Sequence, residues 1–97
     1  MRYQFKTDNL AMLFHTGQGM RLHRDVVKAF VKVVRIIDAA QDERDLRVAK
    51  GRRMEKLTGD REGQYSIRLN DQYRLIFTIE HDEEGSILVI IEIVDYH

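Results

Sequence analysis

The sequence predicts an α+β fold, an antiparallel-rich twisted sheet of about four strands with helices packed on one side. Residues 86–94 are the most apolar and most β-prone run in the chain, which predicts a central strand buried on both faces. Residues 64–69 and 73–80 alternate polar and apolar side chains, as half-buried strands do. Residues 21–40 instead carry apolar side chains every three or four positions, which is typical of an amphipathic helix.

Length and composition indicate a single domain spanning residues 1–97. With 43% hydrophobic and 33% charged residues, the chain has the composition of a globular protein and not of a disordered one. It contains no cysteine, which excludes a disulfide framework, a thiol nucleophile and a cysteine metal site. No apolar run is long enough for a signal peptide or a membrane span, so we expect a cytoplasmic protein without a membrane partner.

The N-terminal half of the chain predicts a short strand followed by three helices. Residues 2–6 alternate as a strand does, and Asp8 can cap a short helix that Gly17 closes. The long helix at 21–40 has an apolar stripe on one side, and Asp42 can cap a further short helix. The basic residues on the other side of the long helix are Arg21, Arg24, Lys28, Lys32 and Arg35. Such a face can bind nucleic acid or an acidic partner, or it can simply be solvated.

The C-terminal half predicts the rest of the sheet. Residues 54–57 can form a short strand or the entry to one, and residues 59–63 form a loop by composition. A turn at Asn70 and Asp71 and a polar hairpin loop at 81–85 separate the three later strands. These strands therefore form an antiparallel meander.

Charge is unevenly distributed along the chain although the net charge is zero. The span from Arg44 to Arg61 holds seven basic and three acidic residues, whereas no lysine or arginine follows Arg74. Segregation of this kind can create a local positive field, and it is also compatible with an ordinary charge-paired surface.

The candidates for chemistry come from the predicted sheet and the end of the chain: Glu55, Arg68, Arg74, Tyr96 and His97. Taken singly, each is an ordinary surface residue. Taken together, they offer the groups that metal-free RNA cleavage needs. A carboxylate can accept the ribose 2′-hydroxyl proton, a guanidinium can stabilise charge on the phosphoryl oxygens, and an imidazolium can protonate the leaving 5′-oxygen. The four histidines lack the spacing of a metal site, so we expect neither a metal nor another cofactor.

Three segments carry a resemblance to a known family: Gly-Asp-Arg-Glu-Gly-Gln-Tyr-Ser-Ile-Arg at 59–68, Gln-Tyr-Arg-Leu-Ile-Phe at 72–77, and the final Asp-Tyr-His at 95–97. Most of the chain resembles the HigB branch of the RelE/ParE superfamily of bacterial toxin–antitoxin systems. The resemblance implies a RelE-like fold and a ribosome-dependent endoribonuclease that cuts mRNA in the decoding site and inhibits translation. It also implies a HigA-like helix-turn-helix antitoxin as partner, with operator DNA reached only through that antitoxin.

The resemblance also implies roles for individual residues. Glu55 stands where HigB relatives often have histidine, and the YoeB branch uses a glutamate there as general base. Arg68 matches the arginine assigned to the transition state, and Arg74 matches a second sheet arginine. Tyr96 and His97 match the terminal pair, with Tyr96 available to stack on a base. The residues expected to hold RNA phosphates are Arg52, Arg53, Lys56, Arg61 and Arg74.

Two features depart from the family pattern. Thr58 occupies the place of a common lysine, and the net charge is zero where most ribosome-dependent toxins are basic. Two alternatives therefore stay open: a ParE-type inhibitor of DNA gyrase, and a weakly catalytic member that acts mainly by binding its antitoxin and regulating transcription. Glu55, Arg68 and the terminal Tyr-His pair favour the nuclease, because a gyrase inhibitor does not need them.

Overall fold

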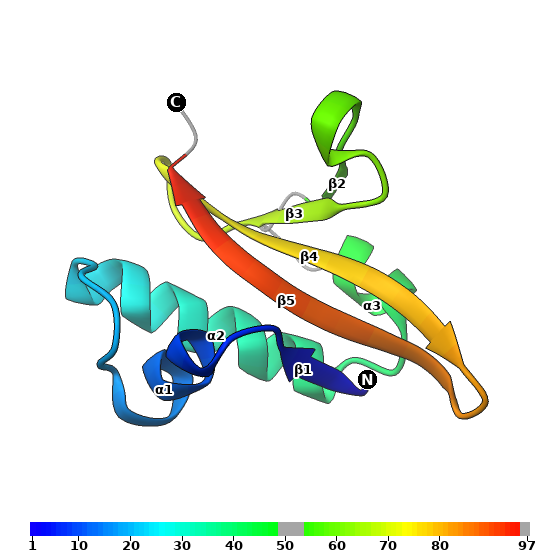
Figure 1. Ribbon diagram of the computed structural model, residues 1–97, viewed down its shortest axis with the longest axis horizontal. Coiled ribbons are helices and arrows are strands. Elements are labelled where there is room, and N and C mark those ends of the chain that lie inside the picture. The colour runs from blue at the N-terminus through cyan, green and yellow to red at the C-terminus, as the bar shows by residue number, and fades with distance from the viewer. Residues whose placement is uncertain (49–53, 96–97) are drawn as a thin grey trace.

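The computed structural model describes residues 1–48 and 54–95. In this part of the chain a five-stranded sheet has the order β1-β5-β4-β3-β2, with the helices on one of its faces (Figure 1). The strands are β1 (Tyr3–Phe5), β2 (Glu55–Lys56), β3 (Tyr65–Arg68), β4 (Tyr73–Asp82) and β5 (Gly85–Asp95). All neighbours are antiparallel except β1, which runs parallel to β5. The predicted α+β class is confirmed. The sheet has five strands where about four were predicted, because the short segment β2 also pairs with it.

Helix α1 (Asp8–Thr16) begins one residue earlier than its predicted cap implies. The hydroxyl of Thr7, and not Asp8, accepts a hydrogen bond from the Leu10 amide at 3.3 Å. Asp8 is instead the first helical residue, where its charge favours the positive end of the helix dipole. Gly17 closes the helix in the left-handed conformation, at φ 75°, as predicted.

Helix α2 (Arg24–Ala39) is shorter at its start than the predicted 21–40. His23 caps it, because its Nδ1 accepts a hydrogen bond from the Asp25 amide at 3.1 Å. Helix α3 (Glu43–Arg47) begins after Asp42, whose carboxylate accepts from the Arg44 amide at 2.9 Å, so that predicted cap is confirmed. No helix of the described residues reaches the length and hydropathy that a membrane span requires.

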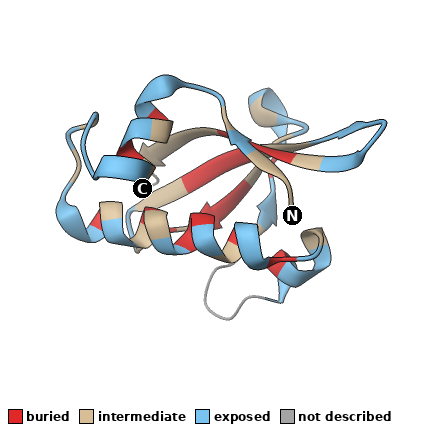
Figure 2. Ribbon diagram, turned by 90° about the horizontal axis from the view of Figure 1, so that it is seen from below, coloured by how far each residue is buried: buried red, intermediate tan, exposed pale blue. Residues whose placement is uncertain are grey.

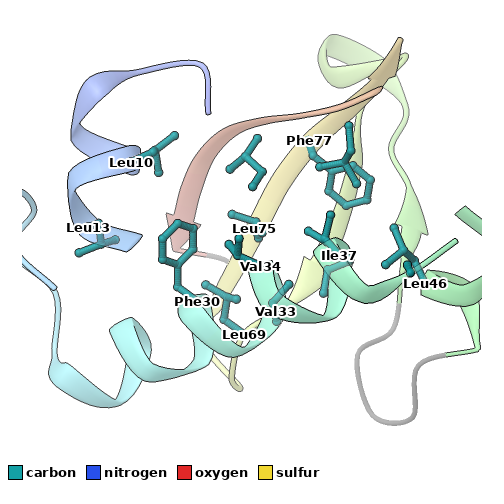
Figure 3. Packing of buried hydrophobic residues seen from close by; sticks show 14 of the residues in the cluster. Leu10, Leu13, Phe30, Val33, Val34, Ile37, Leu46, Leu69, Leu75 and Phe77 are labelled. Atoms are coloured by element: carbon teal, nitrogen blue, oxygen red, sulfur yellow. The ribbon is translucent and has the colours of Figure 1, made fainter. Parts of the chain in front are cut away.

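The hydrophobic core lies between the helices and one face of the sheet (Figure 3). Phe30 of α2 and Phe77 of β4 are fully buried at its centre, and Leu13 and Leu46 join it from α1 and α3. The buried side of α2 faces the strands, as Figure 2 shows in red. The predicted alternation in β3 and β4 is confirmed, because Ile67, Leu75 and Phe77 all belong to this core. The even-numbered residues of these two strands therefore lie on the opposite face, which carries none of the helices α1, α2 and α3 and is called the helix-free face.

A β-bulge changes the alternation of β5. Phe77 pairs with Ile90, but Ile76 pairs with Glu92, so Ile91 is an extra residue without a partner in β4. Leu88, Val89 and Ile90 are buried in succession, which confirms the predicted two-sided burial for the middle of the strand, whereas Ser86 is exposed and residues 91–94 are half-buried. After the bulge Ile93 faces the core opposite Leu75. Without the extra residue, Glu92 would oppose Leu75 and face the core instead.

The hairpin between β4 and β5 is tighter than the predicted loop at 81–85. Pairing continues to Asp82 opposite Gly85, which leaves a two-residue turn at the tip (Figure 1). Arg2 fixes this hairpin to the start of β1, because its guanidinium lies 2.7 Å from the Asp82 carboxylate and donates to the Gly85 carbonyl oxygen at 3.1 Å. The hydrogen bond from Arg2 holds the pKa of Asp82 below its ordinary value.

Candidate active site on the helix-free face of the sheet

The strand register arranges the candidate residues in two rows across the helix-free face. One row runs from Glu55 through Ser66 and Ile76 to Glu92. The neighbouring row pairs Arg68 with Arg74 and then with Val94. Residues two apart on one strand share a face, so the carboxylate of Glu55 and both arginines project to the same side of the molecule. This side is the one opposite the helices.

Arg68 and Arg74 are direct cross-strand partners on either side of the turn that joins β3 to β4. Two like charges in that position repel each other, so each guanidinium needs a neighbouring acceptor or an anion. Arg68 forms an ion pair with Asp71, whose side chain is 93% exposed, and Arg74 donates to the Asn70 carbonyl oxygen at 2.9 Å. The turn thus orients two guanidinium groups side by side, which is an arrangement suited to binding a phosphate.

Asn70 stabilises this turn through its side chain. Its Oδ1 accepts hydrogen bonds from the amides of Gln72 at 2.9 Å and Tyr73 at 2.7 Å. Such an Asx arrangement confirms the predicted turn at 70–71 and fixes the backbone from which Arg68 and Arg74 project. The arginine pair is consequently held by local structure and not only by its own contacts.

Glu55 lies on β2, the edge strand next to β3. Its side chain is exposed, and within the described residues it has no ion-pair partner. Glu55 is opposite Ser66, and Arg68 is two residues further along β3, so Glu55 and Arg68 are diagonal neighbours about 7–8 Å apart between their Cα atoms. An unpaired carboxylate near a guanidinium combines a candidate base with a group that stabilises negative charge.

The structure separates the other predicted RNA contacts. Lys56 is exposed and opposes Tyr65, so the strand pleat directs it to the opposite face from Glu55. Arg61 is engaged within the molecule: its Nη1 lies 2.7 Å from the Glu92 carboxylate and donates to the Gln64 side-chain oxygen at 3.0 Å. Arg74 lies on the helix-free face, next to Arg68, as described above.

Four predicted site residues lie outside the described residues: Arg52, Arg53, Tyr96 and His97. Asp95 is the last described residue of β5, and it pairs with Tyr73, the residue before Arg74. Gln72 donates a side-chain hydrogen bond to the Asp95 carboxylate at 3.0 Å. The last described residue therefore lies at the same end of the sheet as the arginine pair.

Sequence reasoning missed Glu92 and Asp71. Glu92 is the one acidic residue within the apolar run at 86–94, and an acid in such a run was a detectable signal. A strand buried on both faces gives Glu92 no distinct role, and only the bulge turns it toward the helix-free side. The sequence predicts for Asp71 only a place in the turn. Among the described residues, no three histidine, aspartate or glutamate side chains gather as a metal site requires.

The chain is similar in sequence to a known family of proteins. Residues 3–97 match the family model described as the RelE-like toxin of the type II toxin–antitoxin system HigB. The chain is also similar to Toxin HigB-1 of Vibrio cholerae, with 41% identity over 78 residues that cover 79% of this chain and 82% of the relative.

Comparison with solved structures supports the fold. The YoeB/ParE toxin from Agrobacterium tumefaciens has a TM-score of 0.64 and 19% identity, with both chains fully covered. The YoeB toxin in the YoeB–YefM complex from Staphylococcus aureus has a TM-score of 0.59 and 23% identity, covering 100% of this chain and 97% of that chain. At these identities the likeness establishes the fold alone.

Proposed function

Because the chain belongs to the HigB family of RelE-like toxins of type II toxin–antitoxin systems, we propose that it is a ribosome-dependent endoribonuclease that cleaves mRNA and inhibits translation in the cytoplasm. The observation that carries the proposal is the shared face of Glu55, Arg68 and Arg74, which combines a base with two phosphate-binding groups. These side chains supply acid–base and electrostatic catalysis themselves, so the mechanism needs no cofactor.

In this mechanism Glu55 removes the proton from the 2′-hydroxyl of the ribose, and the 2′-oxygen attacks the adjacent phosphorus. The bond from phosphorus to the 5′-oxygen of the next nucleotide breaks, which leaves a 2′,3′-cyclic phosphate and a 5′-hydroxyl. Arg68 stabilises the charge that develops on the non-bridging oxygens, with Arg74 beside it as a second cation. Glu55 suits its role because it is exposed and unpaired within the described residues.

We assign His97 as the acid that protonates the leaving 5′-oxygen, and Tyr96 as a stacking surface for a base. Both residues lie outside the described residues, so support comes from their place in the chain. His97 is two residues beyond Asp95, which lies beside the strand of Arg74. Two residues span at most about 7 Å, a length compatible with the proposed acid acting beside the arginine pair.

Binding to the ribosome requires basic surfaces outside the reacting centre. We assign Arg52, Arg53 and Lys56 to contacts with ribosomal RNA phosphates outside the reacting centre. A second basic surface, the α2 ridge, is formed by residues three or four positions apart on the side of α2 away from the core, all of them exposed. The α2 ridge consists of Arg24, Lys28, Lys32 and Arg35. None of these four takes part in an ion pair with another described residue, so they are available to an external polyanion.

The toxin family implies an antitoxin as protein partner. We propose a HigA-like helix-turn-helix antitoxin that neutralises this chain and carries it to operator DNA. The toxin itself then has no need of a DNA-reading element.

The direct test is cleavage of a defined mRNA on purified ribosomes, with the 5′ ends of the fragments mapped by primer extension. We expect cuts when ribosomes are present and none on the same RNA alone. Glu55→Gln and His97→Ala should each abolish the cuts while leaving the thermal unfolding temperature unchanged, because both residues are chemical and not part of the core.

Two results would overturn the proposal. Translating ribosomes that leave the mRNA intact at every toxin concentration would exclude the nuclease. Gyrase-dependent DNA breaks in a parallel supercoiling assay would then establish the ParE-type alternative, and binding of the antitoxin without either activity would establish the weakly catalytic one.

A further inference from the structure

The contact between Arg61 and Glu92 joins two parts of the molecule that are far apart in the sheet. Arg61 ends the short helix η1 (Gly59–Arg61), which follows the edge strand β2, whereas Glu92 lies on β5. Strands β3 and β4 separate β2 from β5. Three strand spacings amount to about 14 Å, which is longer than an arginine side chain, so the η1 backbone itself folds back over the sheet. Figure 1 shows η1 on the side opposite α1 and α2.

Burial on the helix-free face agrees with this folded position. Ser66 is 1% exposed and Ile76 is fully buried, although both face away from the helices. Leu57, at the start of the loop of residues 57–64 that contains η1, is 7% exposed. These residues occupy the strip between β2 and β5, which the η1 segment covers when Arg61 reaches Glu92.

The backbone alone holds this segment weakly. Strand β2 has only two residues, and among the described residues its one strand partner is β3. Beyond that pairing, four backbone hydrogen bonds connect residues of the segment 57–64 with one another, and none of them reaches β4 or β5. They run from the amides of Leu57 to Gln64 at 2.9 Å, Arg61 to Thr58 at 3.3 Å, Glu62 to Gly59 at 3.1 Å and Gln64 to Arg61 at 3.0 Å, each to a carbonyl oxygen. A two-residue edge strand frays readily unless a side chain fixes it. Among the ion pairs and side-chain hydrogen bonds of the described residues, the contact from Arg61 to Glu92 is the one that joins this loop to β5.

We propose that Glu92 is a positioning residue for the candidate site: its ion pair with Arg61 clamps the η1 loop across the helix-free face and thereby fixes Glu55 relative to Arg68. The proposal rests on the proposed nuclease function for its catalytic consequence, but the clamp itself is a structural statement. Glu92 reaches this face because of the bulge at Ile91, and bulges commonly redirect a side chain beside a functional site.

The clamp makes a different prediction from simple competition for Arg61. If Glu92 positions the loop, removing its charge lowers the rate of cleavage at saturation and leaves the affinity for programmed ribosomes unchanged. If Glu92 instead only withholds Arg61 from RNA phosphates, removing its charge strengthens binding and leaves the saturated rate unchanged.

The experiment compares Glu92→Gln and Arg61→Gln with the charge-swapped double variant Arg61→Glu/Glu92→Arg. Glu62→Gln is the matched control, because Glu62 lies in the same loop, is exposed, and has no ion pair among the described residues. The first measurement is hydrogen exchange at the amides of Leu57 and Gln64, followed residue by residue by NMR. A partly exposed ion pair lowers the population of the locally opened loop by up to about fivefold. The exchange rates of these two amides should therefore rise by about that factor in both single variants.

The second measurement is the saturated cleavage rate on ribosomes, together with the substrate concentration at half saturation. We expect the rate to fall about fivefold in both single variants, with the half-saturation concentration unchanged. The charge-swapped variant should recover both the exchange rate and the cleavage rate, and Glu62→Gln should match the unsubstituted protein. Circular dichroism and thermal unfolding check that each variant is folded.

Unchanged exchange in Glu92→Gln and Arg61→Gln would overturn the clamp. Faster exchange with an unchanged saturated rate, or tighter ribosome binding, would overturn the positioning role. If the unsubstituted protein cleaves no mRNA, the proposed function fails while the exchange data still decide whether the clamp exists.

Discussion

At the scale of single residues, the most informative feature is the pair of facing arginines on β3 and β4. Arg68 and Arg74 are cross-strand partners, and a pair of like charges in that position destabilises a sheet unless anions or dipoles compensate. Asp71 and the Asn70 carbonyl oxygen provide this compensation, and both belong to the connecting turn. A site that must bind a phosphodiester gives a physical reason for keeping the two charges together.

Arg68→Ala should therefore reduce cleavage by lowering the stabilisation of the transition state. We expect a loss of about 2–4 kcal/mol in that stabilisation, comparable with removal of one oxyanion-hole donor. The measurement is single-turnover cleavage on programmed ribosomes. Arg68→Lys is the control, since it keeps the charge but loses the planar pair of donors. Its cleavage rate should lie between the rates of Arg68→Ala and the unsubstituted protein. Equal rates in all three proteins would remove Arg68 from the site.

At the scale of secondary-structure elements, the bulge in β5 and the long β4–β5 hairpin decide what the sheet presents. The bulge lets one strand bury Ile90 and Ile93 on the core side and still place Glu92 on the other face. The hairpin extends beyond β1 and is held to it by Arg2, which pairs with Asp82 and, at 3.4 Å, with Glu84. The hairpin tip consequently depends on electrostatics more than on packing.

Acid should weaken this hairpin attachment through Asp82. The hydrogen bond from Arg2 lowers the folded-state pKa of Asp82 below 3.8, so its contribution to stability is present above that value and is lost as the pH falls through the lower folded pKa. The unfolding temperature of Asp82→Asn should thus lie below that of the unsubstituted protein at neutral pH and converge with it as the pH falls through the lowered folded-state pKa of Asp82.

The check is thermal unfolding followed by circular dichroism over this pH range. Glu83→Gln serves as the control, because Glu83 lies at the same exposed tip and has no ion pair with any described residue. Parallel curves for Asp82→Asn and the unsubstituted protein would show that the Arg2 contact does not contribute.

At the scale of the whole molecule, the sheet separates the two surfaces to which a function is proposed. The candidate site lies on the helix-free face, and the α2 ridge lies beyond the helices on the other side. A chain with zero net charge can engage a polyanion in this way, because exposed cations line one side of α2 while a run of acids, Glu80, Asp82, Glu83 and Glu84, lies apart from them in the β4–β5 hairpin. Two such surfaces fit a binding site enclosed by ribosomal RNA.

Neutralising the α2 ridge should weaken ribosome binding and also reduce its dependence on salt. Each phosphate contact adds about one unit to the slope of log affinity against log salt, so Lys28→Gln/Lys32→Gln should lower that slope by about two. Ribosome pelleting across a salt series measures it. Lys6→Gln, an exposed lysine at the end of β1, is the control and should leave the slope unchanged. If the double variant binds ribosomes normally but loses the antitoxin, the α2 ridge is an acidic-protein surface instead.

The sequence by itself determined the features that depend on neighbouring residues. Alternation places Ile67 and Arg68 on opposite faces of β3, and three-to-four spacing buries Phe30 while exposing Lys32 on α2, because these periods follow directly from strand and helix geometry. For the same reason the turn at Asn70 and the caps at Asp42 and Gly17 were predictable. The shared face of Arg68 and Arg74 followed as well, since a short turn fixes the register of the two strands.

Only the tertiary structure decided the features that depend on distant segments. Nothing local in residues 2–6 indicates that β1 pairs in parallel with β5, and nothing local in β5 reveals the extra residue at Ile91. The register between β4 and β5 arises from packing both strands against the same helices, and that packing selects which side Glu92 occupies. The contact of Arg61 with Glu92 follows from this register, because it joins a loop and a strand that only the folded sheet brings together.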